Sequence, residues 1–166
     1  MEITQALGNL GIKIRETQKV RIEDILKVEE LIKLQPGAMI GDCFPLVHTF
    51  VDGAYVRQIT MPKGALLTSK IHKILHPYFV LKGDVSVITE DGVQRIKAPY
   101  WGLTKPGTKR ILYIHEDTVW ITVHVTGNSS VEEVEKEIIA ESYDDIPNSA
   151  GVIDITAITA ITAITN

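Results

Sequence analysis

The sequence predicts an antiparallel β-sandwich, and two observations carry this prediction. Short apolar runs alternate with turn sequences such as Val51-Asp52-Gly53, Glu90-Asp91-Gly92 and Lys105-Pro106-Gly107, the spacing typical of sandwiches and barrels. The segments between these turns carry no helical pattern, which excludes a doubly wound fold with helices between its strands. The strands that we expect are residues 54–61, 66–75, 77–82, 84–89, 93–97, 110–115 and 118–126.

Length and charge limit the class of protein. A chain of 166 residues is long enough for one domain with a real core and too short for two ordinary ones. A net charge of −4 gives no reason to expect nucleic acid or an anionic membrane as a partner. The single cysteine, Cys43, excludes an internal disulfide. Because the first residues lack a signal-peptide pattern and no apolar run is long enough to span a bilayer, we expect a cytoplasmic protein.

Two amphipathic helices are expected on either side of the strands. Apolar residues recur at helical spacing over residues 21–34, and Pro36 and Gly37 end that pattern. Ser130 and Glu133 form a capping-box sequence that begins a second helix, over about residues 130–142. Residues 1–20 show no convincing period and are expected to be an irregular arm. The chain therefore divides into residues 1–36 (arm and helix), 37–127 (β-domain), 128–150 (helix and linker) and 151–166 (tail).

The tail repeats isoleucine, threonine and alanine with a period of three. Its isoleucines are Ile155, Ile158, Ile161 and Ile164. A period of three matches neither a helix nor a strand, so no single face stays apolar. A frayed terminus is one interpretation. The other is that these isoleucines dock the tail, by strand addition, on a neighbouring subunit or a partner protein.

Three polar residues in the middle of the chain suggest a pocket. Lys70, His72 and His76 lie at positions i, i+2 and i+6. Since successive side chains of a strand alternate between its faces, equal parity puts all three on one side.

The same stretch resembles the first motif of the cupins, Gly-x5-His-x-His-x3,4-Glu-x6-Gly. Gly64 and Gly83 match the two glycines, while Lys70 stands for the first histidine and His76 for the glutamate. Part of the second motif is similar at Pro106-Gly107, where Arg110 stands for the ligand histidine. The resemblance, to RmlC-like cupins, covers roughly residues 54–126. It implies a double-stranded β-helix, or jelly roll, with Lys70, His72, His76 and Arg110 lining its pocket.

Metal binding is the weaker expectation for this pocket. Arginine cannot ligate a metal and lysine would have to lose its proton, so His72 and His76 are the natural ligands. A third ligand could come from His115 or His124. However, Val119, Ile121, Val123 and Val125 form an apolar face of their strand, which predicts that Trp120, Thr122 and His124 point outward. We therefore expect no cofactor, with one divalent transition metal as the alternative.

A second interpretation uses the charges of the pocket. Lys70 and Arg110 beside two histidines would make a cationic niche for a carboxylate, a phosphate or a sugar acid. Cupins of the sugar-nucleotide epimerase kind work without metal, which would make His72 or His76 the base. Candidates for the acid are Tyr78, Tyr100 and Tyr113. Alternatively, the two cations pair with Glu116 or Asp117 and have only a structural role.

Two functions follow from these patterns. The first is a non-catalytic cupin that serves as a structural or binding subunit of an assembly. The residues from His115 to Trp120, with an acidic helix after them, look like small cupin proteins of tailed bacteriophages, which would imply a virion component. The second is a small-molecule enzyme, a sugar epimerase or isomerase or a metal-dependent cupin, that uses His72 and His76. Because an exposed sheet edge must be covered, we expect a homo-oligomer in either case.

Overall fold

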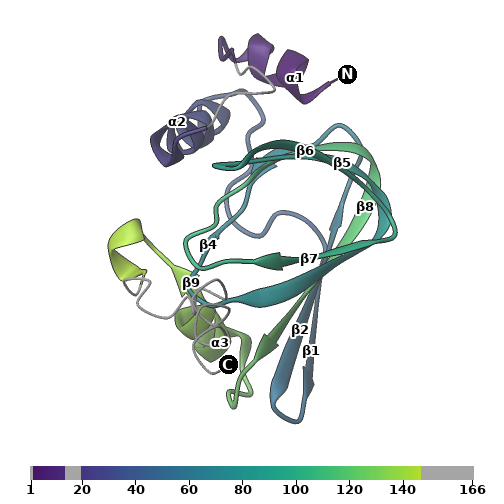
Figure 1. Ribbon diagram of the computed structural model, residues 1–166, viewed down its shortest axis with the longest axis vertical. Coiled ribbons are helices and arrows are strands. Elements are labelled where there is room, and N and C mark those ends of the chain that lie inside the picture. The colour runs from purple at the N-terminus through teal and green to yellow at the C-terminus, as the bar shows by residue number, and fades with distance from the viewer. Residues whose placement is uncertain (1, 14–19, 147–166) are drawn as a thin grey trace, which may run out of the picture.

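A computed structural model describes residues 2–13 and 20–146 and confirms that the body of the protein is built from antiparallel β-strands (Figure 1). Strands pair in the order β1-β2-β8-β5-β6, while β3 also pairs with β8 and β7 with β5. The short strands β4 and β9 pair with each other. The strands are β1 (Leu46–Val51), β2 (Ala54–Met61), β3 (Leu66–Thr68), β4 (Ile71–His72), β5 (His76–Thr89), β6 (Gly92–Lys97), β7 (Tyr100–Thr104), β8 (Ile111–Val125) and β9 (Ile139–Ala140).

The long strands β5 and β8 bend together and divide the sheet into two halves. Their register shifts between Val80 and Val85, opposite Ile114–Trp120 of β8. Gly83 has φ +105° and faces Thr118 so closely that a Cβ atom would overlap it, so only glycine fits this bend. We predicted a turn at Gly83 and a break between residues 115 and 118. Both predictions were wrong, because the chain bends there without leaving the sheet.

Each half has its own partner strands. We call the first the covered half: β3, β6, residues 84–89 of β5 and residues 111–116 of β8. We call the second the open half: β1, β2, β7, residues 76–80 of β5 and residues 118–125 of β8.

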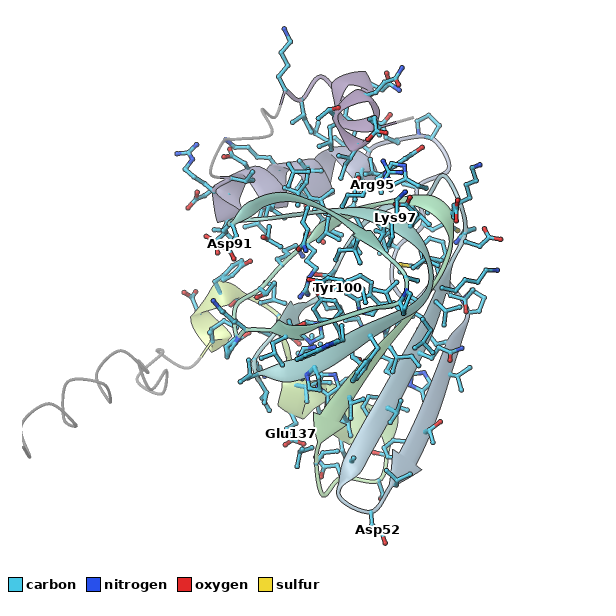
Figure 2. All side chains as sticks on the ribbon, turned by 45° about the vertical axis from the view of Figure 1, so that its right-hand side comes forward. Asp52, Asp91, Arg95, Lys97, Tyr100 and Glu137 are labelled. Carbon is cyan, nitrogen blue, oxygen red and sulfur yellow. The ribbon has the colours of Figure 1, made fainter. Side chains whose placement is uncertain are left out.

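Two helices cover the outer face of the covered half. In Figure 1, α1 (Ile3–Asn9) and α2 (Ile22–Lys33) sit above the arch of β5, β6 and β8. Side chains of both helices pack on that arch, and Arg95 of β6, labelled in Figure 2, pairs with Glu2 just before α1. The shared cluster contains Ile3, Leu7, Ile25, Val28, Ile88, Ile111 and Tyr113.

Helix α2 confirms the predicted helix at residues 21–34, whereas α1 corrects the expected irregular arm. The missed helix is only two turns long, which is too short for its apolar residues to define a period.

A second apolar cluster fills the interior between the two halves. It joins buried residues from both halves of the bent strands: Met61, Tyr78, Val80, Val85, Val87, Ile96, Leu112, Ile114 and Trp120. This cluster is the core of the β-domain, and it holds the two halves of the sheet face to face.

Other elements differ from the predictions in their bounds. The expected strand 66–75 is interrupted between β3 and β4, and β1 and β7 were not predicted. Helix α3 (Val131–Ile138) begins after Ser130, whose hydroxyl accepts from the Glu133 amide at 3.3 Å, as the capping box predicts. It ends before residue 142 because β9 follows it immediately and pairs with β4. A short 3-10 helix, η1 (Tyr143–Asp145), lies in the expected linker.

Within residues 2–13 and 20–146, no helix is long and apolar enough to cross a membrane. The tail isoleucines Ile155, Ile158, Ile161 and Ile164 lie outside the described residues, so their docking stays a prediction.

Candidate metal centre and adjoining cavity

Three histidine side chains from three strands meet inside the open half. His72 comes from β4, His76 begins β5 and His124 lies near the end of β8. The ring centres of His72 and His76 are 4.4 Å apart, those of His76 and His124 4.1 Å, and those of His72 and His124 5.9 Å. One nitrogen of each ring lies within 4.8 Å of the other two. We call these residues the three-histidine cluster.

The pairing of the strands explains why these residues meet. Tyr78 of β5 is opposite Thr122 of β8, and the strands run antiparallel. His76 comes two residues before Tyr78, and His124 comes two residues after Thr122. Because the strands are antiparallel, both steps lead in the same direction, so the two histidines share a face and lie side by side. The β4–β9 pair sets His72 opposite Ile139 and brings it to the same point.

Most of the cluster's nitrogen atoms have no hydrogen-bond partner. His76 and His124 are each 2% exposed. His76 donates from Nδ1 to the carbonyl oxygen of Ile74 at 2.9 Å, which leaves Nε2 with a free lone pair. Among the described residues, His76 Nε2, His72 Nδ1 and both ring nitrogens of His124 are buried without a partner. Unpaired buried polar atoms are unfavourable, so this arrangement calls for a group that residues 2–13 and 20–146 do not supply.

Burial keeps these imidazoles uncharged. Desolvation, together with the neighbouring His76 and other nearby groups, lowers the pKa of His72 to about 2 and that of His124 to about 3. The pKa of His76 is lowered as well, first by burial and also by the charge of Arg110. Neutral imidazole is the form that binds metal ions. Within the described part of the chain, no carboxylate or thiol joins the cluster.

A cavity of about 730 Å³ borders the cluster. His72 and His124 line one part of it, and Arg110, Trp120 and Thr122 line another. A space of this size holds a small organic molecule.

Of the predicted pocket cations, Lys70 has carboxylate partners. It lines the cavity, but its ammonium group is 3.2 Å from Asp42 and 2.9 Å from Glu135, and its side chain is 37% exposed. These partners are neither Glu116 nor Asp117, the two acids that the sequence suggested. Lys70 is therefore a partly exposed member of an ion-pair network at the edge of the cavity.

Arg110 lies deeper in the molecule and differs from Lys70 in its surroundings. It is 6% exposed, and its Nη2 donates to Thr104 Oγ1 at 2.8 Å. The guanidinium lies 5.2 Å from the ring centre of Tyr78 and 5.9 Å from that of Trp120, two rings that stack on each other at 4.5 Å. No carboxylate of the described residues pairs with it.

The candidate acids are placed differently from one another. Tyr78 stacks below Arg110, and burial raises its pKa to about 12. Tyr100, labelled in Figure 2, accepts a hydrogen bond from Gln94 at 3.0 Å. Tyr113 is buried in the cluster that the helices cover. Tyr78 is thus the one of the three that contacts a predicted pocket residue.

His124 was placed on the wrong face by the sequence interpretation. Trp120, Thr122 and His124 are buried inside, whereas Val125, expected in the core, is 84% exposed. The alternation was predicted correctly, but the inner face of the open half carries Trp120, Thr122 and His124 to the cavity, while its outer face is apolar. His115, the other candidate for a third ligand, bonds instead to Ser86 Oγ at 2.8 Å. The signal that could have placed His124 inside is the antiparallel pairing of β5 and β8, which sets His124 beside His76.

No protein-family model matches this chain, and no curated protein matches it. Similar solved structures include a cupin-2 domain protein from Shewanella frigidimarina (6% identity, 64% of this chain and 94% of that one, TM-score 0.43). A cupin protein from Bacteroides fragilis is 19% identical over 55% of this chain and 85% of its own, with TM-score 0.42. The DMSP lyase DddQ from Ruegeria pomeroyi is 13% identical over 53% and 49%, with TM-score 0.45. At these scores the likeness carries no argument about function.

Proposed function

We propose that this chain is a cupin-like protein that binds one divalent transition metal ion through His72, His76 and His124 and acts on a small molecule held in the adjoining cavity. The observation that carries the proposal is the convergence of three buried imidazoles whose nitrogens lack partners.

The ligand set suits such an ion. Imidazole binds zinc, copper, iron and nickel, and three protein ligands leave a coordination position for water or substrate. The hydrogen bond from His76 to the Ile74 carbonyl fixes the ring and its tautomer, as is usual for metal-bound histidines. When bound, the metal supplies Lewis-acid or redox chemistry. The cavity walls orient the small molecule and limit its access to water.

This proposal favours the small-molecule enzyme over the non-catalytic subunit, the two functions predicted from the sequence. His72 and His76 occupy ligand positions of the cupin frame that the sequence resembles, while Lys70 and Arg110 occupy the other two. His124 lies outside that frame. Of the two histidines considered as a third ligand, it is the one whose ring nitrogen lies within 4.8 Å of those of His72 and His76, which supports the proposal.

Native mass spectrometry of the full chain tests the proposal, because one spectrum reports both bound metal and subunit count. We expect one zinc or cobalt ion per chain after loading and removal of excess metal. His124→Ala should weaken binding by more than about 100-fold, the upper range for losing an outer-shell partner. His48→Gln is the matched control, since His48 lies outside the cluster and bonds to Tyr55. Absence of metal in the wild type, or equal binding by His124→Ala, would overturn the proposal.

The non-catalytic subunit of an assembly stays the second candidate. It is favoured by the outer face of the open half, which no other described element covers and where Val47, Trp101, Leu103 and Val125 are all more than half exposed. The occupant that we expect is a second copy of this chain. A monomer without metal in the same spectrum would contradict both candidates. The similar solved structures give no support to a bacteriophage origin or a virion location.

A further inference from the structure

Building on the proposed function, we propose that the cavity binds the carboxylate of a small organic acid on Arg110 and directs the rest of that molecule toward Thr122 and the three-histidine cluster.

The first argument is the burial of an unpaired cation. Arg110 is 6% exposed, yet the described residues offer it one hydroxyl acceptor and two aromatic rings and no carboxylate. Burying a guanidinium without an anion is strongly unfavourable, and cation–π contacts offset only part of that penalty.

The preceding residue makes the contrast clear. Lys109 is 5% exposed, like Arg110, but its ammonium group is 3.0 Å from Glu29. Two adjacent buried cations therefore differ in their pairing: the described residues supply a carboxylate for Lys109 and none for Arg110. Since Arg110 lines the cavity, a carboxylate that enters the cavity can pair with it.

The second argument places this cation near the three-histidine cluster. Arg110 bonds to Thr104, and Thr104 is the partner of His76 in the β5–β7 register. Along the inner face of β8, Trp120 lies below Arg110, Thr122 comes next and His124 after it. Equivalent positions of a strand are about 6.8 Å apart. Arg110 and the cluster thus lie at two ends of one short wall.

Thr122 lies between these ends and has its own unmet hydrogen bond. Thr122 lines the cavity, and its hydroxyl oxygen is buried without a partner among the described residues. Apolar side chains, including Phe44, Ile59 and Leu112, line other parts of the cavity. The complementary molecule has a carboxylate at one end, an apolar body, and a polar group that reaches Thr122 or the cluster.

A carboxylate fits better than a phosphate. One guanidinium matches the single charge and planar shape of a carboxylate. The other cations that line the cavity already have carboxylate partners, including Lys109 with Glu29 and both Arg57 and Lys70 with Asp42, so a dianionic phosphate would lack a second free counter-charge.

Ligand-observed NMR on the full chain tests this inference with three probes: benzoate, its neutral isostere benzamide, and inorganic phosphate. We expect benzoate to bind in both metal-free and zinc-loaded protein, and benzamide and phosphate to bind at least about tenfold more weakly, as the loss of charge-assisted hydrogen bonds predicts. Arg110→Met should weaken benzoate binding by a similar factor. Lys82→Met, which removes an exposed cation outside the cavity, should leave it unchanged.

Arg110→Lys is a second variant that controls for misfolding of Arg110→Met. It keeps the charge and should therefore retain part of the benzoate binding. If benzoate fails to bind while metal still binds one per chain, this inference is overturned and the proposed function stands. If benzoate binds through Arg110 in a chain that takes up no metal, the metal proposal fails and the carboxylate site stands. Stronger binding of phosphate than of benzoate would also overturn the assignment.

Discussion

The two halves of strands β5 and β8 differ in how deeply they are buried. In the covered half, successive residues are buried without alternation, as at 84–88 of β5 and 111–114 of β8. In the open half, burial alternates along 76–80 and 118–124. The same two strands are therefore interior strands at one end and surface strands at the other. The difference lies in what packs on their outer faces.

Helices α1 and α2 pack on the covered half, while among the described residues no helix covers the outer face of the open half in the same way (Figure 1). The covered half uses both faces for apolar packing. The open half has an inner face free to carry polar groups, and it holds the three-histidine cluster and Thr122. One half thus provides stability and the other provides the candidate site.

The largest expected effect is on stability, and it compares isoleucines from the two halves. Ile88→Ala, in the covered half where Ile88 is 0% exposed, should lower the free energy of unfolding by about 3 kcal/mol, within the usual range for buried isoleucine. Ile121→Ala is the matched control, because Ile121 points to the outer face of the open half and should lose less than about 1 kcal/mol. Urea denaturation measures both. Equal losses would mean that the outer face of the open half is covered in solution.

The next effect is the pH dependence of the open half. An unfolded imidazole has a pKa of about 6.5, whereas those of His72 and His124 in the folded chain are about 2 and about 3. The unfolded chain therefore binds more protons below pH ~6.5. The stability from the neutral histidines is fully present above that pH and falls, by about 1.4 kcal/mol per pH unit for each histidine, as the pH drops toward their folded pKa values.

Urea denaturation of EDTA-treated protein at pH 7 and pH 5 measures this dependence. His124→Phe removes one of the titrating groups, so its loss between the two pH values should be smaller than that of the wild type. Identical pH dependence in the two proteins would contradict the assignment of the loss to the cluster.

The smallest effect is expected at the edge of the cavity. Lys70→Met removes two ion pairs whose members are each about one third exposed, and exposed ion pairs contribute less than about 1 kcal/mol. We expect little change in the free energy of unfolding and none in metal stoichiometry. Loss of metal binding in this variant would show that Lys70 belongs to the site and not to its rim.

Much of the fold could be predicted from local patterns. Strands β2 and β6, helix α2 and the start of α3 follow from periodicity, turns and a capping box, all of which depend on neighbouring residues. Helix α1 was missed because two turns carry too few residues to show a period; β1, a mostly exposed strand at the edge of the sheet, and β7 were missed as well. The bend at Gly83 looked like a turn, because a glycine with positive φ is found both in turns and in bends within a strand. Only the close contact with Thr118 shows that Gly83 is in a bend.

The candidate site was predictable only in part. His72 and His76 do meet, with ring centres 4.4 Å apart, but they belong to separate strands, β4 and β5, and not to one face of a single strand, so the alternation argument for them was wrong. The position of His124 depended on which face of β8 faces the interior. The valines of the outer face are apolar, and this led to the wrong prediction that their face is the buried one. Lys70 and Arg110 looked equivalent in the sequence, but one is paired at the rim and the other is unpaired in the interior.

The sequence by itself determined the strand-rich body and two of its helices, because each depends on short-range geometry. Only the tertiary structure decided which face of each strand is inside, which histidine completes the cluster and which cation lacks a counter-charge. Those outcomes depend on packing between residues far apart in the chain. They also depend on where the helices cover the sheet and where they leave it open.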